Sequence, residues 1–217
     1  MRPLFRAAGH EFFAPTYTGL GERAHLARPE IDLSTHVQDV AAVLEIEDLK
    51  EVTLLGHSYG GMVATGVADK LGGRIARVVY IDAFAPRDGE SLFDLLGAKG
   101  EAHMRAGAAK DGDGWKLPLN PMPPDTSPED QAWAVPRRRP QPIKTFEEKI
   151  RLSSTNFPPR RYIYARKNGP GDVFRQFAER AKSEPGWKYW EIDASHNPHI
   201  TCPEAQMALL TQIMASK

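Results

Sequence analysis

The chain has 217 residues, which is enough for one domain with a sizeable core and an insertion. Its 28 basic and 28 acidic residues cancel, so no net charge favours binding to nucleic acid or to an anionic membrane. No run of about 18 apolar residues predicts a membrane-spanning helix, and the first ten residues contain no apolar leader. The single cysteine, Cys202, excludes an intrachain disulfide. We therefore expect a cytoplasmic protein, either a monomer or a homo-oligomer.

The first part of the chain alternates between helical and extended patterns. Residues 1–9 are predicted to be the end of a helix, because apolar residues share one face and glycine follows them, and residues 10–17 are predicted to be a short strand. A second helix is predicted to begin near Asp32 or Ser34, either of which can cap it. Its apolar residues have the spacing of an amphipathic helix: Val37, Val40, Ala41 and Leu44.

The same alternation continues along the chain. Predicted strands cover residues 52–57, 77–82, 161–166 and 188–193, and predicted helices cover residues 59–71, 172–182 and 204–215. Strands that alternate with helices predict an α/β fold, with a mostly parallel sheet flanked by helices. In such sheets ligands bind at the carboxyl ends of the strands. Four polar residues lie just after predicted strands and would meet at that edge: Ser58, Asp82, Asp172 and His196.

Residues 84–159 interrupt the alternation. Proline is dense there, and helical patterns are confined to fragments around residues 91–96 and 147–153. A structureless loop of this length is unusual in a compact domain, so we predict an insertion that packs over the rest of a single domain as a cap. Its candidates for an apolar substrate pocket are Phe93, Trp115 and Trp133. Its basic run is interpreted as a solvated patch, with anion binding as the alternative: Arg137, Arg138 and Arg139.

The stretch around Ser58 has the pattern of a nucleophile elbow. Gly56-x-Ser58-x-Gly60 lies between an apolar, β-prone run and a helix rich in small residues. A serine nucleophile must be exposed at a sharp turn, and glycine two residues to either side removes side chains that would clash. The following helix points free N–H groups back at the site, so the Tyr59 N–H is the natural first oxyanion donor. The alternative is a passive serine in a glycine-rich turn.

A serine nucleophile needs a base and an acid that orients the base. His196 follows the last predicted strand, from which its imidazole can reach Ser58, and His199 on the same loop is the alternative. For the acid we favour Asp172, with Asp82 as the alternative, although an aspartate at a helix start is also an ordinary cap. Because no further ligands gather near these histidines and Asp193, we expect no metal and no cofactor.

Four segments together resemble the α/β-hydrolase superfamily. They are Gly56-His-Ser-Tyr-Gly-Gly, Ala14-Pro-Thr-Tyr-Thr-Gly-Leu-Gly-Glu-Arg, Tyr80-Ile-Asp-Ala-Phe-Ala-Pro and Ser195-His196. The closest resemblance is to the branch of small-ester hydrolases that includes plant methyl-ester esterases, hydroxynitrile lyases and bacterial pyrethroid-type esterases. It implies Ser58 as the nucleophile, His196 as the base and an acid at Asp172. Lyases of this branch carry lysine after the catalytic histidine, and Asn197 here disfavours that reaction.

The sequence departs from this family at its start. Members begin with a strand that ends in a His-Gly loop, which supplies a second oxyanion N–H, whereas this sequence starts in the helix that follows. We therefore expect the sheet to lack a central strand between residues 10–17 and 52–57. Loss of one oxyanion donor typically lowers turnover about 10²–10³-fold, and an unpaired strand edge invites aggregation or swapping.

The leading hypothesis is a carboxylic ester hydrolase that acts on small hydrophobic esters through an acyl-enzyme, with a small-molecule ester as its partner. The alternative is a non-catalytic or truncated member of the same fold that binds a small apolar ligand. A third hypothesis is different chemistry on the same residues, such as cofactor-free perhydrolysis or C–C bond hydrolysis.

Overall fold

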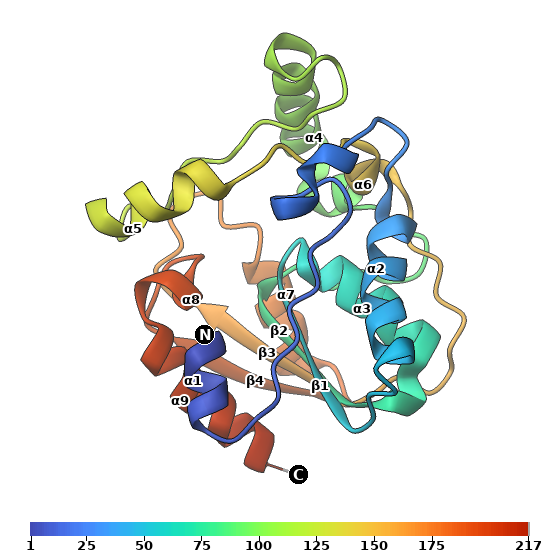
Figure 1. Cartoon of the computed structure of the whole chain (residues 1–217), viewed down its shortest axis with the longest axis vertical. Helices are drawn as coiled ribbons and strands as arrows, with labels where there is room; N and C mark the ends of the chain where they lie inside the picture. Colours follow the sequence, from blue (N-terminus) through green and yellow to red (C-terminus); the bar gives the residue numbers. More distant parts are fainter. Residues whose placement is uncertain (217) are drawn as a thin grey trace.

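The computed structural model describes residues 1–216, and its centre is a four-stranded sheet (Figure 1). The strands are all parallel and lie in chain order: β1 (Val52–Ser58), β2 (Ile75–Ala83), β3 (Arg160–Ala165) and β4 (Trp187–Ile192). β2 and β3 are mostly buried, and their centres carry consecutive apolar or aromatic residues, Val78–Ile81 and Tyr162–Ile163, as expected of parallel strands covered on both faces. The predicted α/β class with a parallel sheet is confirmed.

Helices cover both faces of the sheet, and alternate strand residues face the two layers. Val78, Tyr80 and Tyr162 pack against one layer, whereas Val79, Ile81 and Ile163 pack against the other. The first layer contains α2 (Leu33–Ile46), α3 (Gly60–Leu71) and α7 (Arg175–Ser183). The second contains α1 (Arg2–Ala7) and α9 (Pro203–Ala215). Short helical turns complete the connections: η1 (Gly21–Leu26), η2 (Gly72–Arg74) and α8 (Pro198–Thr201). None of the described helices is both long and apolar enough to cross a membrane.

The helix ends follow the expected signals. Asp32 caps α2 by accepting a hydrogen bond from the Thr35 backbone N–H at 2.9 Å, and Gly9 adopts a left-handed φ of 80° just after α1. Because the four strands are parallel neighbours, the carboxyl ends of β1, β2, β3 and β4 lie at one edge of the sheet.

The predicted strand over residues 10–17 is absent. These residues run beside β1 in Figure 1, but no backbone hydrogen bond joins them to β1 in the described part of the chain. A groove of about 480 Å³ separates the two, and it is lined by apolar side chains such as Phe12, Val40 and Leu54. β1 is consequently an edge strand with one open side. An extended segment with no backbone partner within reach cannot form a ladder, whatever its β propensity.

Residues 84–159 connect β2 to β3 and are more helical than their sequence indicates. They contain α4 (Leu92–Asp111), α5 (Pro128–Ala134), η3 (Val135–Arg137) and α6 (Lys144–Glu147). Ser91 and Asp94 form a capping box at the start of α4, which bends at Gly97, where φ is 73°. In Figure 1 this segment rises from the sheet as α4 and crosses above its carboxyl edge as α5.

The predicted helix over residues 147–153 is wrong beyond Glu147. Aspartate side chains bind the backbone N–H groups that a helix would use: Asp88 accepts from Leu152 at 2.7 Å, and Asp69 accepts from Ser153 at 2.9 Å. These longer-range hydrogen bonds hold the segment in an extended path along the body of the domain.

The approach of α3 to β2 generates a stability prediction. A Cβ atom on Gly61 would lie 2.0 Å from the Phe84 carbonyl oxygen, which is backbone and cannot rotate away. We expect Gly61→Ala to lower the free energy of unfolding by about 3 kcal/mol, as measured by urea denaturation. The matched control is Gly73→Ala, where a Cβ atom meets nothing within 4 Å. Equal effects of the two substitutions would contradict the close-packing argument.

Candidate active site

Ser58 lies at the sharp turn between β1 and α3. Its φ of 53° is in the left-handed region, which is costly for a non-glycine residue and is held here by the packing around it. A Cβ atom on Gly56 would lie 2.6 Å from the Gly60 carbonyl oxygen, so the turn can close only with glycine at that position. This is the strained, exposed geometry that the Gly56-x-Ser58-x-Gly60 pattern predicts.

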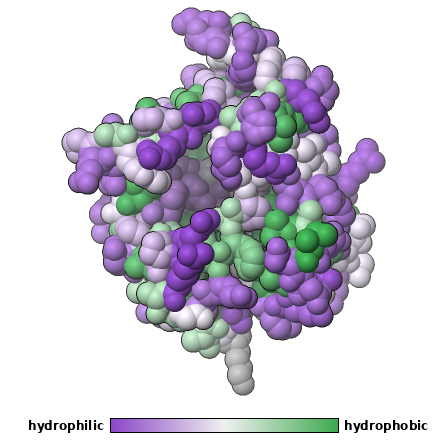
Figure 2. Space-filling view, in the orientation of Figure 1, coloured by the Kyte–Doolittle hydropathy of each residue, from purple (hydrophilic) through white to green (hydrophobic). Residues whose placement is uncertain are grey.

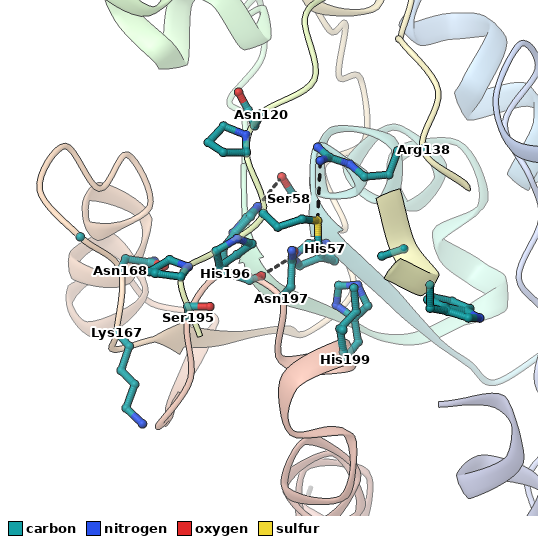
Figure 3. Close-up of a pocket in the computed structure, with 18 of the residues that line it drawn as sticks. His57, Ser58, Asn120, Arg138, Lys167, Asn168, Ser195, His196, Asn197 and His199 are labelled. Carbon is teal, nitrogen blue, oxygen red and sulfur yellow. Dashed lines mark hydrogen bonds between the residues drawn. The ribbon is translucent and has the colours of Figure 1, made fainter. Parts of the chain in front are cut away.

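His196 stands between the serine and a buried carboxylate. Its Nε2 lies 3.0 Å from the Ser58 Oγ (Figure 3). Its Nδ1 lies 2.7 Å from Oδ2 of Asp82. A carboxylate only accepts, so Nδ1 carries the hydrogen and the Nε2 lone pair faces the serine hydroxyl. Nε2 can therefore accept the Ser58 proton, while the carboxylate would stabilise the imidazolium that forms.

Asp82, the alternative acid, occupies the position next to His196. It ends β2 with a φ of 42° and is fully buried. Its Oδ1 accepts hydrogen bonds from the Ala165 backbone N–H at 3.2 Å and from the Asn168 amide at 3.1 Å. These donors compensate the carboxylate for its burial and fix the direction in which it points.

Asp172, the acid that the sequence favoured, does not contact His196 in the structure. It accepts hydrogen bonds from the Tyr164 hydroxyl at 2.6 Å and from the Phe174 backbone N–H at 2.9 Å. It thus ties down the turn before α7, a role close to the capping alternative. Asp172 also touches the Asn168 amide at 3.3 Å, and that amide in turn reaches Asp82.

Aromatic rings hold the His196 imidazole from both sides. The Phe174 ring stacks on it with centroids 4.7 Å apart, and the His57 ring lies 4.6 Å away on another side. His57 Nε2 also donates a hydrogen bond to the His196 carbonyl oxygen at 2.6 Å, which fixes the loop as well as the ring. His199 packs against the edge of His57 and is not bonded to Ser58, so the geometry favours His196 over His199 as the base.

Burial keeps the neighbouring histidines neutral. Desolvation, reinforced by His196 and His199, lowers the pKa of His57 well below its usual value. Desolvation, reinforced by His196 and the amino group of Met1, lowers the pKa of His199 to about 4. Both rings are therefore uncharged at neutral pH. A positive charge that appears on His196 during proton transfer meets no fixed positive charge on these two rings.

The Tyr59 backbone N–H has no acceptor in the described part of the chain and begins α3 next to Ser58. The Tyr59 side chain points away, where its hydroxyl lies 2.8 Å from Nδ1 of His36. Because His36 Nε2 donates to the Thr18 carbonyl, Nδ1 accepts and the tyrosine hydroxyl donates. This buried network anchors the elbow from behind and leaves the N–H free for a developing negative charge.

A cavity of about 600 Å³ opens over Ser58 and His196. Figure 2 shows it as a hollow on this face with hydrophilic residues at its rim. Of the three predicted pocket aromatics, only Trp133 lines it. Phe93 is buried in a separate cluster with Met104 and Leu117, against which Trp115 packs, so these two rings form the core of the 84–159 segment instead. Aromatic residues in a segment of this kind must also supply its core, and the sequence does not separate the two roles.

Two polar residues at the site carried no assignment from the sequence. Asn168 follows β3, and its place after a strand at the shared edge is a signal that could have indicated it. Asp125 accepts hydrogen bonds from both the backbone N–H and the hydroxyl of Ser195, and so ties the 84–159 segment to the His196 loop. It lies in a proline-rich stretch without periodicity, where no sequence pattern indicates it. Residues 1–216 contain no cluster of metal-ligating side chains, and Asp193 faces Arg166 and Lys167.

Comparisons with known proteins agree with the fold. A family model described as the alpha/beta hydrolase family matches residues 1–208. A carbendazim hydrolyzing esterase from a Nocardioides species is 34% identical over 207 residues, which cover 91% of this chain and 86% of that protein. An extracellular alpha/beta-hydrolase from a Paenibacillus species superposes with a TM-score of 0.85 at 24% identity, covering 97% of this chain and 90% of that chain. A pyrethroid hydrolase from Sphingobium faniae has a TM-score of 0.71 at 21% identity, covering 98% and 89%. At these identities the structural matches concern the fold.

The lowered pKa of His199 predicts acid sensitivity. The group has a pKa near 6.5 when unfolded and about 4 when folded, so the unfolded state binds more protons between these values. The stability that neutral His199 contributes is complete above pH 6.5 and is lost as the pH falls toward about 4. We expect His199→Gln to flatten the pH dependence of the unfolding free energy there by at most about 1.4 kcal/mol per pH unit. Urea denaturation of both proteins across this pH range tests the prediction. The difference in unfolding free energy between wild type and variant at about pH 8 measures the lost packing and serves as the reference. A difference that stays constant with pH would contradict the assignment.

Proposed function

Because the chain belongs to the alpha/beta hydrolase family, we propose that it is a serine esterase that cleaves small carboxylic esters through an acyl-enzyme. The observation that carries the proposal is the continuous line from Ser58 Oγ through both nitrogens of His196 to the buried Asp82 carboxylate. The Nocardioides relative, itself an esterase by name, supports the same reaction class.

The proposed reaction uses each group at a stated atom. Ser58 Oγ attacks the ester carbonyl as its proton passes to His196 Nε2, and Asp82 stabilises the resulting imidazolium. The Tyr59 N–H donates to the oxyanion of the tetrahedral intermediate. The imidazolium then gives its proton to the leaving alkoxide. Water then attacks the carbonyl of the acyl-enzyme, with His196 as general base. This step releases the carboxylic acid product and restores the Ser58 hydroxyl.

The cavity walls support a substrate with an apolar body. Part of the cavity lining comes from the 84–159 segment and offers carbon-rich surface, including Pro121, Met122 and Trp133. In the proposal this segment is a cap over the site. Carbendazim belongs among the first compounds to test because the Nocardioides relative is named for its hydrolysis.

The alternative function is binding of a small apolar ligand without catalysis. The observation that favours it is the oxyanion position, where we identify the Tyr59 N–H as the backbone donor next to Ser58 among the described residues. A single donor predicts slower turnover by about 10²–10³-fold, which is weak catalysis rather than none. An assay of serine reactivity separates the two functions.

We expect a fluorophosphonate to label this protein once, at Ser58, because His196 Nε2 accepts the hydroxyl proton. Ser58→Ala should abolish the adduct, and His196→Ala should slow labelling by at least about 10³-fold. Intact-mass spectrometry measures the adduct, and circular dichroism checks that each variant is folded. A folded wild-type protein that takes up no label would leave non-catalytic ligand binding as the function.

Substitution of each aspartate by asparagine tests the identity of the acid. Asp82→Asn keeps the size of the side chain but removes the charge that fixes the His196 tautomer, so kcat for 4-nitrophenyl acetate should fall by about 10⁴-fold. Asp172→Asn, which alters a carboxylate bonded to Tyr164, should change kcat by less than about tenfold. A larger loss of kcat in Asp172→Asn than in Asp82→Asn would instead identify Asp172 as the acid.

A further inference from the structure

The cavity over Ser58 has a charge that the whole chain lacks. Its lining includes three cationic side chains, Arg137, Arg138 and Lys167, and no aspartate or glutamate among the described residues. The chain as a whole has equal numbers of acidic and basic residues. The positive charges are therefore gathered at the site, where low-dielectric walls strengthen their effect on a bound ligand.

The three cations differ in their partners. Lys167 forms an ion pair with Asp193 at 3.0 Å, and Arg137 lies over the Trp133 ring at 4.8 Å and donates to the Trp133 carbonyl. Arg138 is half-buried, and its guanidinium has one side-chain partner, the sulfur of Met122 at 3.6 Å. A thioether is a weak acceptor for a group with five N–H donors. No carboxylate in the described part of the chain pairs with Arg138.

The guanidinium of Arg138 also points into the cavity (Figure 3). Figure 3 shows it directed into the space above His57 and Ser58, facing the wall that carries Asn120. The planar fork of an arginine matches a carboxylate through two parallel hydrogen bonds, which makes it a selective group in a pocket rather than a diffuse charge. The basic run, interpreted from the sequence as a solvated patch with anion binding as the alternative, thus contributes Arg137 and Arg138 to the cavity lining.

We propose that Arg138 is an anion-recognition subsite, and that preferred substrates are esters with an apolar body and one carboxylate group. This deepens the proposed esterase function and rests on it. The carboxylate of the substrate would lie against Arg138 on the wall formed by residues 120–138 and away from the Tyr59 N–H, where a second negative charge would oppose the oxyanion. Arg138 acts by binding and orienting the substrate, and the chemical steps stay with Ser58 and His196.

Matched ester pairs test the proposal. Monomethyl glutarate and methyl valerate differ in an acyl-end carboxylate, and 4-acetoxybenzoate and 4-methylphenyl acetate differ in a carboxylate on the leaving group. For at least one pair, kcat/KM of the wild type should favour the anionic ester. Arg138→Gln should lower kcat/KM for that ester by about 10- to 100-fold and change the neutral ester by less than about twofold. Arg138→Lys should retain part of the preference.

Arg139→Gln is the matched control. Arg139 is exposed and donates to the carbonyl oxygens of Pro136 and Arg138, and it does not line the cavity. Its loss removes the same charge from the next position in the sequence, so it should leave the anionic preference intact. A preference that is absent in the wild type, survives Arg138→Gln, or falls equally with Arg139→Gln would overturn the subsite.

A binding measurement keeps this proposal separable from the esterase proposal. Calorimetric titration with benzoate should give binding to the wild type that Arg138→Gln removes, while benzamide binds both proteins equally. That result would support the subsite even if no ester were hydrolysed and Ser58 took up no label, in which case the esterase function alone would fail. Hydrolysis of neutral esters with no benzoate binding would instead overturn the subsite alone.

Discussion

The close approach of α3 to the sheet is the constraint on which the site depends. Ser58 can hold a φ of 53° only if the backbone folds back on itself between Gly56 and Gly60 and α3 then packs at backbone distance against the end of β2. Gly61 permits that packing, and the same end of β2 carries Asp82. The spacing between Ser58 and Asp82 is therefore set by packing of main chain on main chain, which leaves little room for rearrangement.

The strand order explains why Asp82 rather than Asp172 reaches His196. β2 lies directly beside β1, so a residue at its end is one strand away from Ser58, and the register shift after His57 pairs Ser58 with Ala83. Asp172 lies beyond the end of β3, after a loop in which its carboxylate finds closer donors in Tyr164 and Phe174. Sequence order alone places both aspartates after strands. The distinction required the length of the loop after β3 and the left-handed φ of Asp82, neither of which leaves a sequence pattern.

The parts of the fold that sequence predicted well are those in which local pattern and packing agree. The elbow, the Asp32 cap of α2 and the strand from Val78 to Ile81 each satisfy local preference and burial together. Residues 10–17 have β propensity but lie across a groove from β1 without a backbone hydrogen bond to it, and a ladder needs a bonded partner. The segment 84–159 takes its form from long-range bonds, such as those from Asp69 and Asp125, which periodicity cannot reveal. Ser58 and His196 stood out because the spacing and loop position that bring them together are local.

Burial and charge act in different parts of the site. Asp82 is buried with its own donors, while His57 and His199 are kept neutral by the surroundings that also fix the His196 loop. The charge of Asp82 is therefore balanced within the protein, and these residues need no charged group on the substrate as a partner. The unpaired cation lies farther out, on the 84–159 segment, where Met122 is the side-chain partner of Arg138. Within this segment Phe93 and Leu117 pack in a small separate core, whereas Leu92 and Ile150 belong to the main core on the α3 side of the sheet. In the proposed function, the inner residues would cleave the ester, and the outer wall with Arg138 would select which ester is bound.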